Sequence, residues 1–244
     1  MKNVSYTYED APRPAVSGVD AHVPAKSLLG VVGPTGSGKT TLLNLLGRLF
    51  EPRGEVSLDG VPTQRLSLST LRGALAYVPQ DSFLFSDTYR ANLEFGVEEP
   101  LSEERLEEII EASGMTEEVA EFRDGLEQMI GERGVTLSGG QRQRSCIARA
   151  LARDPSVLIL DDALSAVDTE TEARLLRSLR RAGEGRTVVI SAHRLATVKD
   201  ADQILCLADG KVDAIGTHEE LLERSSWYRE TWDRQRMQEE LQEL

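Results

Sequence analysis

Short apolar runs alternate with longer segments of helical periodicity along this chain. The runs at 28–32 and 157–160 are apolar throughout, and the run at 187–190 is apolar after one threonine. Runs of four or five apolar residues predict strands that are buried on both faces of a sheet. The segment from Lys39 to Leu49 is apolar on nearly every side and predicts a buried helix, and another helix should open after Asp168. Because strands and helices alternate, the pattern indicates a parallel α/β core.

The other segments carry their own start and stop signals. Ser102 is placed as the N-cap of a helix that Gly114 would end, so the region from about 84 to 155 predicts a helical lobe. Asp209-Gly210 lies between two apolar runs and predicts a hairpin turn. Thr217, with a glutamate three residues later, forms a capping-box pattern, and the chain should end in helix.

A glycine-rich loop follows the first predicted buried strand. Gly33-Pro-Thr-Gly-Ser-Gly-Lys-Thr40 fits the pattern G-x-x-x-x-G-K-[ST] and lies between a predicted strand and a predicted helix, as a phosphate-binding loop must. The glycines let backbone N–H groups converge on phosphate oxygens, and the helix dipole adds to the attraction. Lys39 should reach the β and γ phosphates, and the Thr40 hydroxyl should ligate Mg²⁺. A tight strand-to-helix turn alone would explain one glycine but not the Lys-Thr pair.

Polar side chains follow three other predicted strands. Asp161 and Asp162 end the run at 157–160, Gln80 follows Ala76-Tyr-Val, and His193 follows the run at 187–190. Ligands collect at the carboxyl ends of parallel strands, so these segments should converge on the phosphate loop. Asp161 can hold Mg²⁺ through its water shell, and Asp162 can orient or deprotonate an attacking water.

Composition narrows the class of protein. The chain has 244 residues, enough for one large domain, and a net charge of −13 with a pI near 4.8 argues against a nucleic-acid partner. Cys146 and Cys206 lie in apolar contexts without ligand spacing, so neither a disulfide nor a metal role is expected. No apolar segment approaches the roughly 18 residues of a membrane span, and the chain as given is expected to be soluble.

One more motif lies between the two phosphate-site segments, and it comprises Leu137, Ser138, Gly139, Gly140 and Gln141. With this motif the chain resembles, over nearly its whole length, the nucleotide-binding domain of an ATP-binding-cassette (ABC) transporter. Members of that family share the strand Asp, the Gln after a strand, a switch His and a Ser-Ala-x-Asp loop, here Ser165 to Asp168. In the family two such domains pair head to tail, with ATP between the phosphate loop of one and the signature motif of the other.

The resemblance implies a fold. It is a P-loop NTPase core with a mainly parallel sheet, an N-terminal antiparallel β subdomain and a helical subdomain that carries the signature motif. Residues 1–244 would form one nucleotide-binding domain, with 1–83 and 156–244 as the ATP-binding lobe and 84–155 as the helical lobe.

The resemblance also implies roles for individual residues, with ATP and Mg²⁺ as the ligands. The nucleotide would be bound by Tyr8, stacked on adenine, and by Gly33, Pro34, Thr35, Gly36, Ser37, Gly38, Lys39, Thr40 and Thr41. Catalysis would involve Asp162, His193, Lys39 and Gln80. The metal ion would be bound by Thr40, Gln80 and Asp161, and Asp168 would take part in communication across the dimer. The signature residues would act on the partner's ATP, because the N–H groups and the hydroxyl that open their helix form an anion site without a lysine.

Two stretches are similar to the exporter branch of the family. These are Gln80 to Thr88 and Gly131 to Gly134, which by analogy touch the membrane domain. Exporters usually carry a transmembrane domain fused upstream, so we expect an excised domain with a supplied Met1, native to the cytoplasmic face of the cell membrane.

Asp162 stands where efficient relatives carry Glu. A carboxylate that is one bond short is displaced by about 1.5 Å, and an error of about 1 Å can cost on the order of a hundredfold in rate. Such a change resembles the weakened site of heterodimeric multidrug-type exporters, so a non-identical partner is expected. Two alternatives stay open: a nucleotide clamp with little turnover, and a homodimer in which Asp162 works. A cassette ATPase of DNA repair or translation is disfavoured by the acidic balance.

Overall fold

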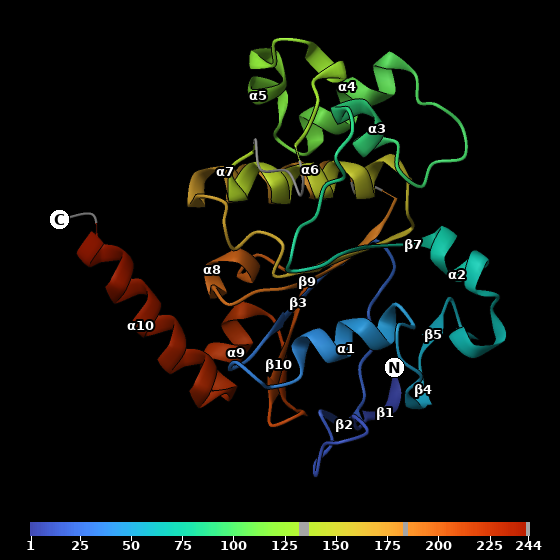
Figure 1. Cartoon of the computed structure of the whole chain (residues 1–244). Helices are drawn as coiled ribbons and strands as arrows, with labels where there is room; N and C mark the ends of the chain where they lie inside the picture. The colour runs from blue at the N-terminus through green and yellow to red at the C-terminus, as the bar shows by residue number, and fades with distance from the viewer. Residues whose placement is uncertain (132–136, 183–184, 243–244) are drawn as a thin grey trace. The chain divides into compact units, whose positions relative to one another are not determined.

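The computed structural model describes residues 1–131, 137–182 and 185–242 (Figure 1). The chain divides into two compact units, Met1–Arg72 with Thr187–Leu244 and Gly73–Arg186. Among the described residues no helix is long and apolar enough to cross a membrane.

The first unit contains a sheet of strands in the order β11-β10-β3-β9. The strands are β3 (Leu28–Val32), β9 (Thr187–Ser191), β10 (Gln203–Ala208) and β11 (Lys211–Gly216). β3 pairs in parallel with β9 and β10, while β11 returns antiparallel along β10 through the turn Asp209-Gly210. Both turn residues have left-handed φ values, 48° and 76°, which confirms the predicted hairpin. Every residue of β3 is buried, as its apolar run predicts.

A second, antiparallel sheet in this unit has the order β2-β1-β4. Its strands are β1 (Lys2–Tyr6), β2 (Val16–Val19) and β4 (Arg53–Glu55), followed by the short hairpin β5 (Ser57–Leu58) and β6 (Val61–Pro62), the turn η1 (Thr63–Arg65) and α2 (Leu68–Ala74). Val4, Val16 and Val19 are fully buried and give this sheet its share of the core. The antiparallel β region implied by the family resemblance is therefore confirmed.

The other helices of the first unit are α1 (Lys39–Leu46), α8 (Leu195–Val198), α9 (His218–Arg224) and α10 (Ser226–Gln242). α1 ends earlier than the expected Leu49, because Gly47 caps it and Arg48 turns to a left-handed φ of 49°. Thr217 and Glu220 form the predicted capping box at the start of α9. Figure 1 shows α9 leading directly into the long C-terminal helix α10.

The second unit is largely helical. It contains the parallel strands β7 (Leu75–Val78) and β8 (Val157–Asp161), the turn η2 (Gly125–Glu127), and α3 (Tyr89–Leu93), α4 (Glu103–Ala112), α5 (Thr116–Glu121), α6 (Gly139–Ala152) and α7 (Thr169–Ala182). α6 packs against α3, α4 and β7. Ser102 caps α4 through its hydroxyl, and Gly114 follows that helix with a φ of 68°, as predicted.

The boundaries of the compact units differ from those of the predicted lobes. β7 and β8 group with the helices of residues 73–186, whereas the expected helical lobe covers 84–155 only. The compact units are defined by contacts within each unit, whereas the lobes are implied by the family resemblance. The division into lobes therefore stays a prediction. Both cysteines are free and buried, and burial raises the pKa of each thiol, that of Cys206 to about 12.

Candidate functional site

The glycine-rich loop connects β3 to α1 in a shape that only glycine permits at three positions. Gly33, Gly36 and Gly38 have φ values of 152°, 80° and 100°. A Cβ on Gly33 would lie 2.2 Å from the carbonyl oxygen of Leu207, and one on Gly38 would lie 2.3 Å from that of Ala15. The loop is therefore fixed by contacts that leave no room for side chains.

Polar groups within the loop point to an anionic ligand. Lys39 is 8% exposed, and its Nζ donates to the carbonyl oxygens of Gly33 at 2.9 Å and Pro34 at 3.1 Å. Ser37 is 3% exposed, and its Oγ has no hydrogen-bond partner among the residues that the structure describes. An unpartnered buried hydroxyl costs free energy, and a phosphate oxygen would satisfy it. The loop at the start of α1 fits a nucleotide phosphate, with Thr35, Gly36 and Thr40 exposed to receive it.

Tyr8 is anchored beside this loop. Its hydroxyl shares a hydrogen bond of 3.1 Å with Thr41 Oγ1 on α1, and its ring meets Tyr6 and Phe50 edge-on. The side chain is nevertheless 39% exposed. These contacts hold the ring in place while more than a third of the side chain stays exposed, and the stacking of Tyr8 on adenine stays a prediction. Thr41, which the resemblance implies as a nucleotide contact, is buried and shares this hydrogen bond with Tyr8; its contact with the nucleotide stays a prediction.

Asp161 and Asp162 end β8 in two different environments. Asp161 is 2% exposed, and its Oδ2 accepts a hydrogen bond from the Tyr77 hydroxyl at 3.1 Å. Asp162 is half-buried, has a left-handed φ of 48°, and accepts a hydrogen bond of 3.2 Å from Gln80 Nε2. Within the second unit, Gln80 therefore lies next to Asp162, as the strand ends predict.

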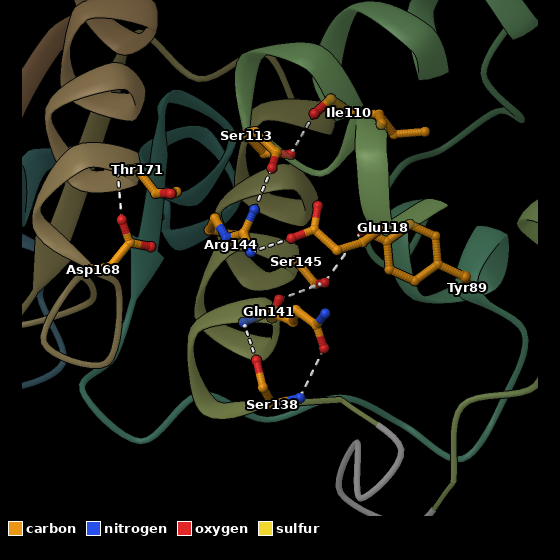
Figure 2. Close-up of polar contacts among 11 residues, drawn as sticks. Tyr89, Ile110, Ser113, Glu118, Ser138, Gln141, Arg144, Ser145, Asp168 and Thr171 are labelled. Carbon is orange, nitrogen blue, oxygen red and sulfur yellow. Dashed lines mark hydrogen bonds and ion pairs between the residues drawn. The ribbon is translucent and has the colours of Figure 1, made fainter. Parts of the chain in front are cut away.

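The signature motif begins α6 with a reciprocal cap (Figure 2). Ser138 Oγ accepts from the N–H of Gln141 at 3.2 Å, and Gln141 Oε1 accepts from the N–H of Ser138 at 2.9 Å. The predicted helix start is confirmed. A Cβ on Gly140 would lie 2.8 Å from the carbonyl oxygen of Ala166, so the glycines pack directly against the following loop. Of the loop expected to precede this motif, Glu132 to Gly134 lie outside the described residues.

The Ser-Ala-x-Asp loop is tied to α6 by a glutamine. Gln143 Nε2 donates to Ser165 Oγ at 3.1 Å, and Gln143 Oε1 accepts from the N–H of Ala166 at 2.9 Å. At the end of the loop, Asp168 Oδ1 accepts from the N–H of Thr171 at 2.9 Å. Bonds from Thr171 lower the pKa of Asp168, which acts as the N-cap of α7.

A buried ion pair supports α6 from its other side. Arg144 bonds to Glu118, as Figure 2 shows, and its side chain is 10% exposed. It also bonds to the carbonyl oxygen of Gly114. Ser145, one residue later, shares a hydrogen bond of 3.2 Å with the hydroxyl of Tyr89, whose pKa burial raises. These bonds connect the helix that carries the signature motif to α3, α4 and α5.

His193 lies on an exposed loop of the first unit, between β9 and α8. Gln235 of α10 bonds to the backbone on both sides of the loop. Sequence reasoning missed Gln235, Tyr77 and Gln143 because each contacts the site from a distant element. Tyr77 alone had a signal, since it lies in the strand that precedes Gln80.

Comparisons with known proteins agree with this geometry. A family model described as ABC transporter matches residues 16–165. The chain is 44% identical over 231 residues to an ATP-dependent lipid A-core flippase of Cupriavidus pinatubonensis, covering 93% of this chain and 39% of the flippase. It is 42% identical over 238 residues to a probable multidrug resistance ABC transporter ATP-binding/permease protein of Bacillus subtilis, covering 97% of this chain and 40% of that protein.

A solved structure described as a bacterial Atm1-family ABC exporter with ATP bound superposes with a TM-score of 0.90 at 37% identity, covering 96% of this chain and 41% of that chain. The chain thus spans 39% to 41% of the length of these relatives. The family match, the identities and the shared fold all concern the nucleotide-binding part of such proteins. The chain therefore belongs to the ABC transporter family, and it has the fold of the nucleotide-binding domain of that family's exporters.

Proposed function

We propose that this chain binds Mg-ATP and hydrolyses it as the motor domain of an exporter, paired head to tail with a second nucleotide-binding domain. The observation that carries the proposal is the phosphate loop, with its orphaned Ser37 hydroxyl and its buried Lys39. A transmembrane domain, fused upstream as in the longer relatives, would use the motion of the pair, and the chain would work at the cytoplasmic face of the membrane.

The residues divide the work as follows. The backbone N–H groups of the loop and Lys39 bind the phosphates, and Tyr8 holds the base by stacking. Thr40, Asp161 and Gln80 would hold Mg²⁺, which neutralises charge on the phosphate oxygens. Asp162 orients the attacking water and accepts its proton, and His193 contacts the terminal phosphate.

The signature motif serves the other subunit in this proposal. The helix N-terminus at Ser138 to Gln141 offers backbone donors and a positive dipole end to the γ-phosphate held by the partner. Asp168, at the edge of the adjoining loop, would carry information between the two sites. A second nucleotide-binding domain is therefore part of a complete site.

We further propose that the site on this chain is the slow one of a non-identical pair. The side chain of Asp162 is one methylene shorter than that of Glu. Its carboxylate also accepts a hydrogen bond from Gln80 at 3.2 Å, which fixes its position. The intact signature motif would complete a faster site on the partner. A nucleotide clamp and an active homodimer are the two competing readings.

ATP binding by calorimetry and single-turnover phosphate release, with the chain in excess, test the proposal on wild type, Lys39→Ala and Asp162→Ala. We expect wild type to bind Mg-ATP and to release phosphate slowly, Lys39→Ala to lose most binding, and Asp162→Ala to keep binding while losing the residual turnover. Absence of ATP binding in wild type would refute the nucleotide function.

The same measurements separate the alternatives. Fast wild-type turnover that Asp162→Ala abolishes would favour the homodimer, and tight binding without turnover would favour the clamp. In a mixed pair with a chain that has Glu at this position, Ser138→Ala on the present chain should lower the partner's turnover. Unchanged turnover there would contradict the trans role of the signature motif.

A further inference from the structure

The last helix of the chain holds the loop that carries His193. Gln235, on α10, uses both ends of its side-chain amide: Oε1 accepts from the N–H of Leu195 at 2.8 Å, and Nε2 donates to the carbonyl oxygen of His193 at 2.9 Å. The partners lie 40 and 42 residues away in the sequence. One planar amide therefore fixes the backbone on both sides of residue 194.

The loop depends on this outside contact because α8 is too short to order it. α8 spans only Leu195–Val198, and Arg194 at its N-cap makes no side-chain cap. The first N–H groups of a helix have no partner within it, and Gln235 supplies one to Leu195 from another helix. The two bonds made by Gln235 replace hydrogen bonds that these backbone groups would otherwise make to water.

The other end of α8 is fixed by close packing. Val198 is fully buried, and a Cβ on Gly30 of β3 would lie 2.7 Å from the Val198 Cβ, so helix and strand are in direct contact. Leu195 is 1% exposed. α8 is thus immobilised on β3, and the orientation of the exposed His193 depends on the backbone just before α8, where Gln235 bonds.

A second link from α10 is weaker. Arg194 Nη2 lies 3.7 Å from Glu239 Oε1, with side chains that are 36% and 49% exposed. An exposed pair of this kind contributes little. Gln235 is half-buried and makes two backbone bonds, so it is the stronger of these two links between α10 and the loop.

We infer that Gln235 is a positioning residue for His193, and that α10 thereby sets the rate at which bound ATP is hydrolysed. This inference rests on the proposed function, in which His193 contacts the terminal phosphate. Gln235 bonds to the backbone of Leu195 and His193, and the proposed function gives it no contact with the nucleotide. Loss of its bonds should leave ATP binding intact and lower the hydrolysis rate, since an error of about 1 Å in a reacting group can cost on the order of a hundredfold.

The test compares Gln235→Leu with Gln238→Leu, the same change at an exposed glutamine of the same helix. Two readouts are needed: amide hydrogen exchange at Leu195, and kcat and KM for ATP from steady-state phosphate release at varied ATP. Gln235→Leu should speed exchange at Leu195 by about threefold or more, the loss of one ordinary hydrogen bond. It should lower kcat about tenfold, within the range for a misplaced group, and leave KM unchanged. Gln238→Leu should change none of these.

A third arm repeats Gln235→Leu in a His193→Ala background, where it should cause no additional loss because the residue being positioned is absent. An equal loss with and without His193 would mean a general effect on folding and would overturn the inference. Unchanged exchange at Leu195, or faster exchange with unchanged kcat, would overturn it as well. Absence of hydrolysis in wild type would instead refute the proposed function, and with it this inference.

Discussion

Replacing Asp162 by Glu adds one methylene to a side chain at the end of β8. The extra bond carries the carboxylate about 1.5 Å further. Because a misplacement of about 1 Å can cost about a hundredfold in rate, we expect Asp162→Glu to raise kcat by about tenfold to a hundredfold. That range corresponds to about 1.4 to 2.7 kcal/mol of activation free energy. KM for ATP should stay unchanged, since in the proposed function Asp162 acts on water and not on the nucleotide.

The backbone sets a cost against this gain. Asp162 has a φ of 48°, in the left-handed region. Most residues lose about 1 to 2 kcal/mol there, whereas Asp and Asn often escape part of the loss because their short side chains bond locally. Asp162→Glu should therefore lower the free energy of unfolding by about 1 kcal/mol. In the proposed function, Asp at this position favours the left-handed backbone conformation at the expense of the hydrolysis rate.

Asp59→Glu is the matched control. Asp59 has a φ of 50°, in the exposed turn between β5 and β6. Both variants should lose similar stability in urea unfolding, but only Asp162→Glu should gain turnover, measured by phosphate release with the chain in excess. If Asp162→Glu binds ATP normally and hydrolyses it no faster than wild type, the short carboxylate does not limit the rate and the reasoning is wrong.

Further predictions concern the residues around the two motifs. Tyr8→Ala should weaken ATP binding by about 1 to 3 kcal/mol if the ring stacks on the base, whereas Tyr8→Phe should keep most of it; equal affinity of wild type and Tyr8→Ala in calorimetry would remove the assignment. Asp168→Ala should lower stability by about 1 kcal/mol and Asp168→Asn by much less, because only Asn retains the cap; equal shifts in thermal unfolding would contradict the capping role. Arg144→Met should lower the free energy of unfolding by about 2 to 3 kcal/mol, since it leaves the half-buried Glu118 carboxylate without its partner; the addition of Glu118→Leu should recover part of the loss in urea unfolding.

The sequence predicts the elements of this fold well where local signals are strong. The buried strands at 28–32 and 187–190 follow from their apolar runs, and α6 starts at the signature motif, where a helix is expected to open. The end of α1 is predicted three residues too late, at Leu49 instead of Leu46. Gly47 and the left-handed Arg48 end that helix. The apolar Leu49 continues the helical pattern in the sequence, so the stop at Gly47 is not apparent from the pattern.

The candidate site is predictable only as far as its motifs extend. The phosphate loop follows from its own motif, and the closeness of Gln80 and Asp162 follows from the parallel pairing of β7 and β8. Gln143 and Gln235 carry no such signal, because each is an ordinary polar residue on a helix until tertiary structure places it against another segment. Hydrogen bonds between distant elements depend on packing, which local periodicity does not encode.

The packing of the signature motif limits what its glycines can reveal about function. A Cβ on Gly139 would meet the Cβ of Ala166 at 3.2 Å, and one on Gly140 would meet the Ala166 carbonyl at 2.8 Å. Any substitution at Gly140 must therefore move the loop that leads to Asp168 within the same chain, whatever it does to a nucleotide on a partner. The Ser138 side chain instead caps its own helix by accepting from the N–H of Gln141. This cap can be retained in a variant, since Asn is as good an N-cap as Ser. Ser138→Asn thus keeps the helix start while replacing the hydroxyl, and it isolates the effect on the partner's ATP that a glycine variant would confuse with distortion of residues 165–168.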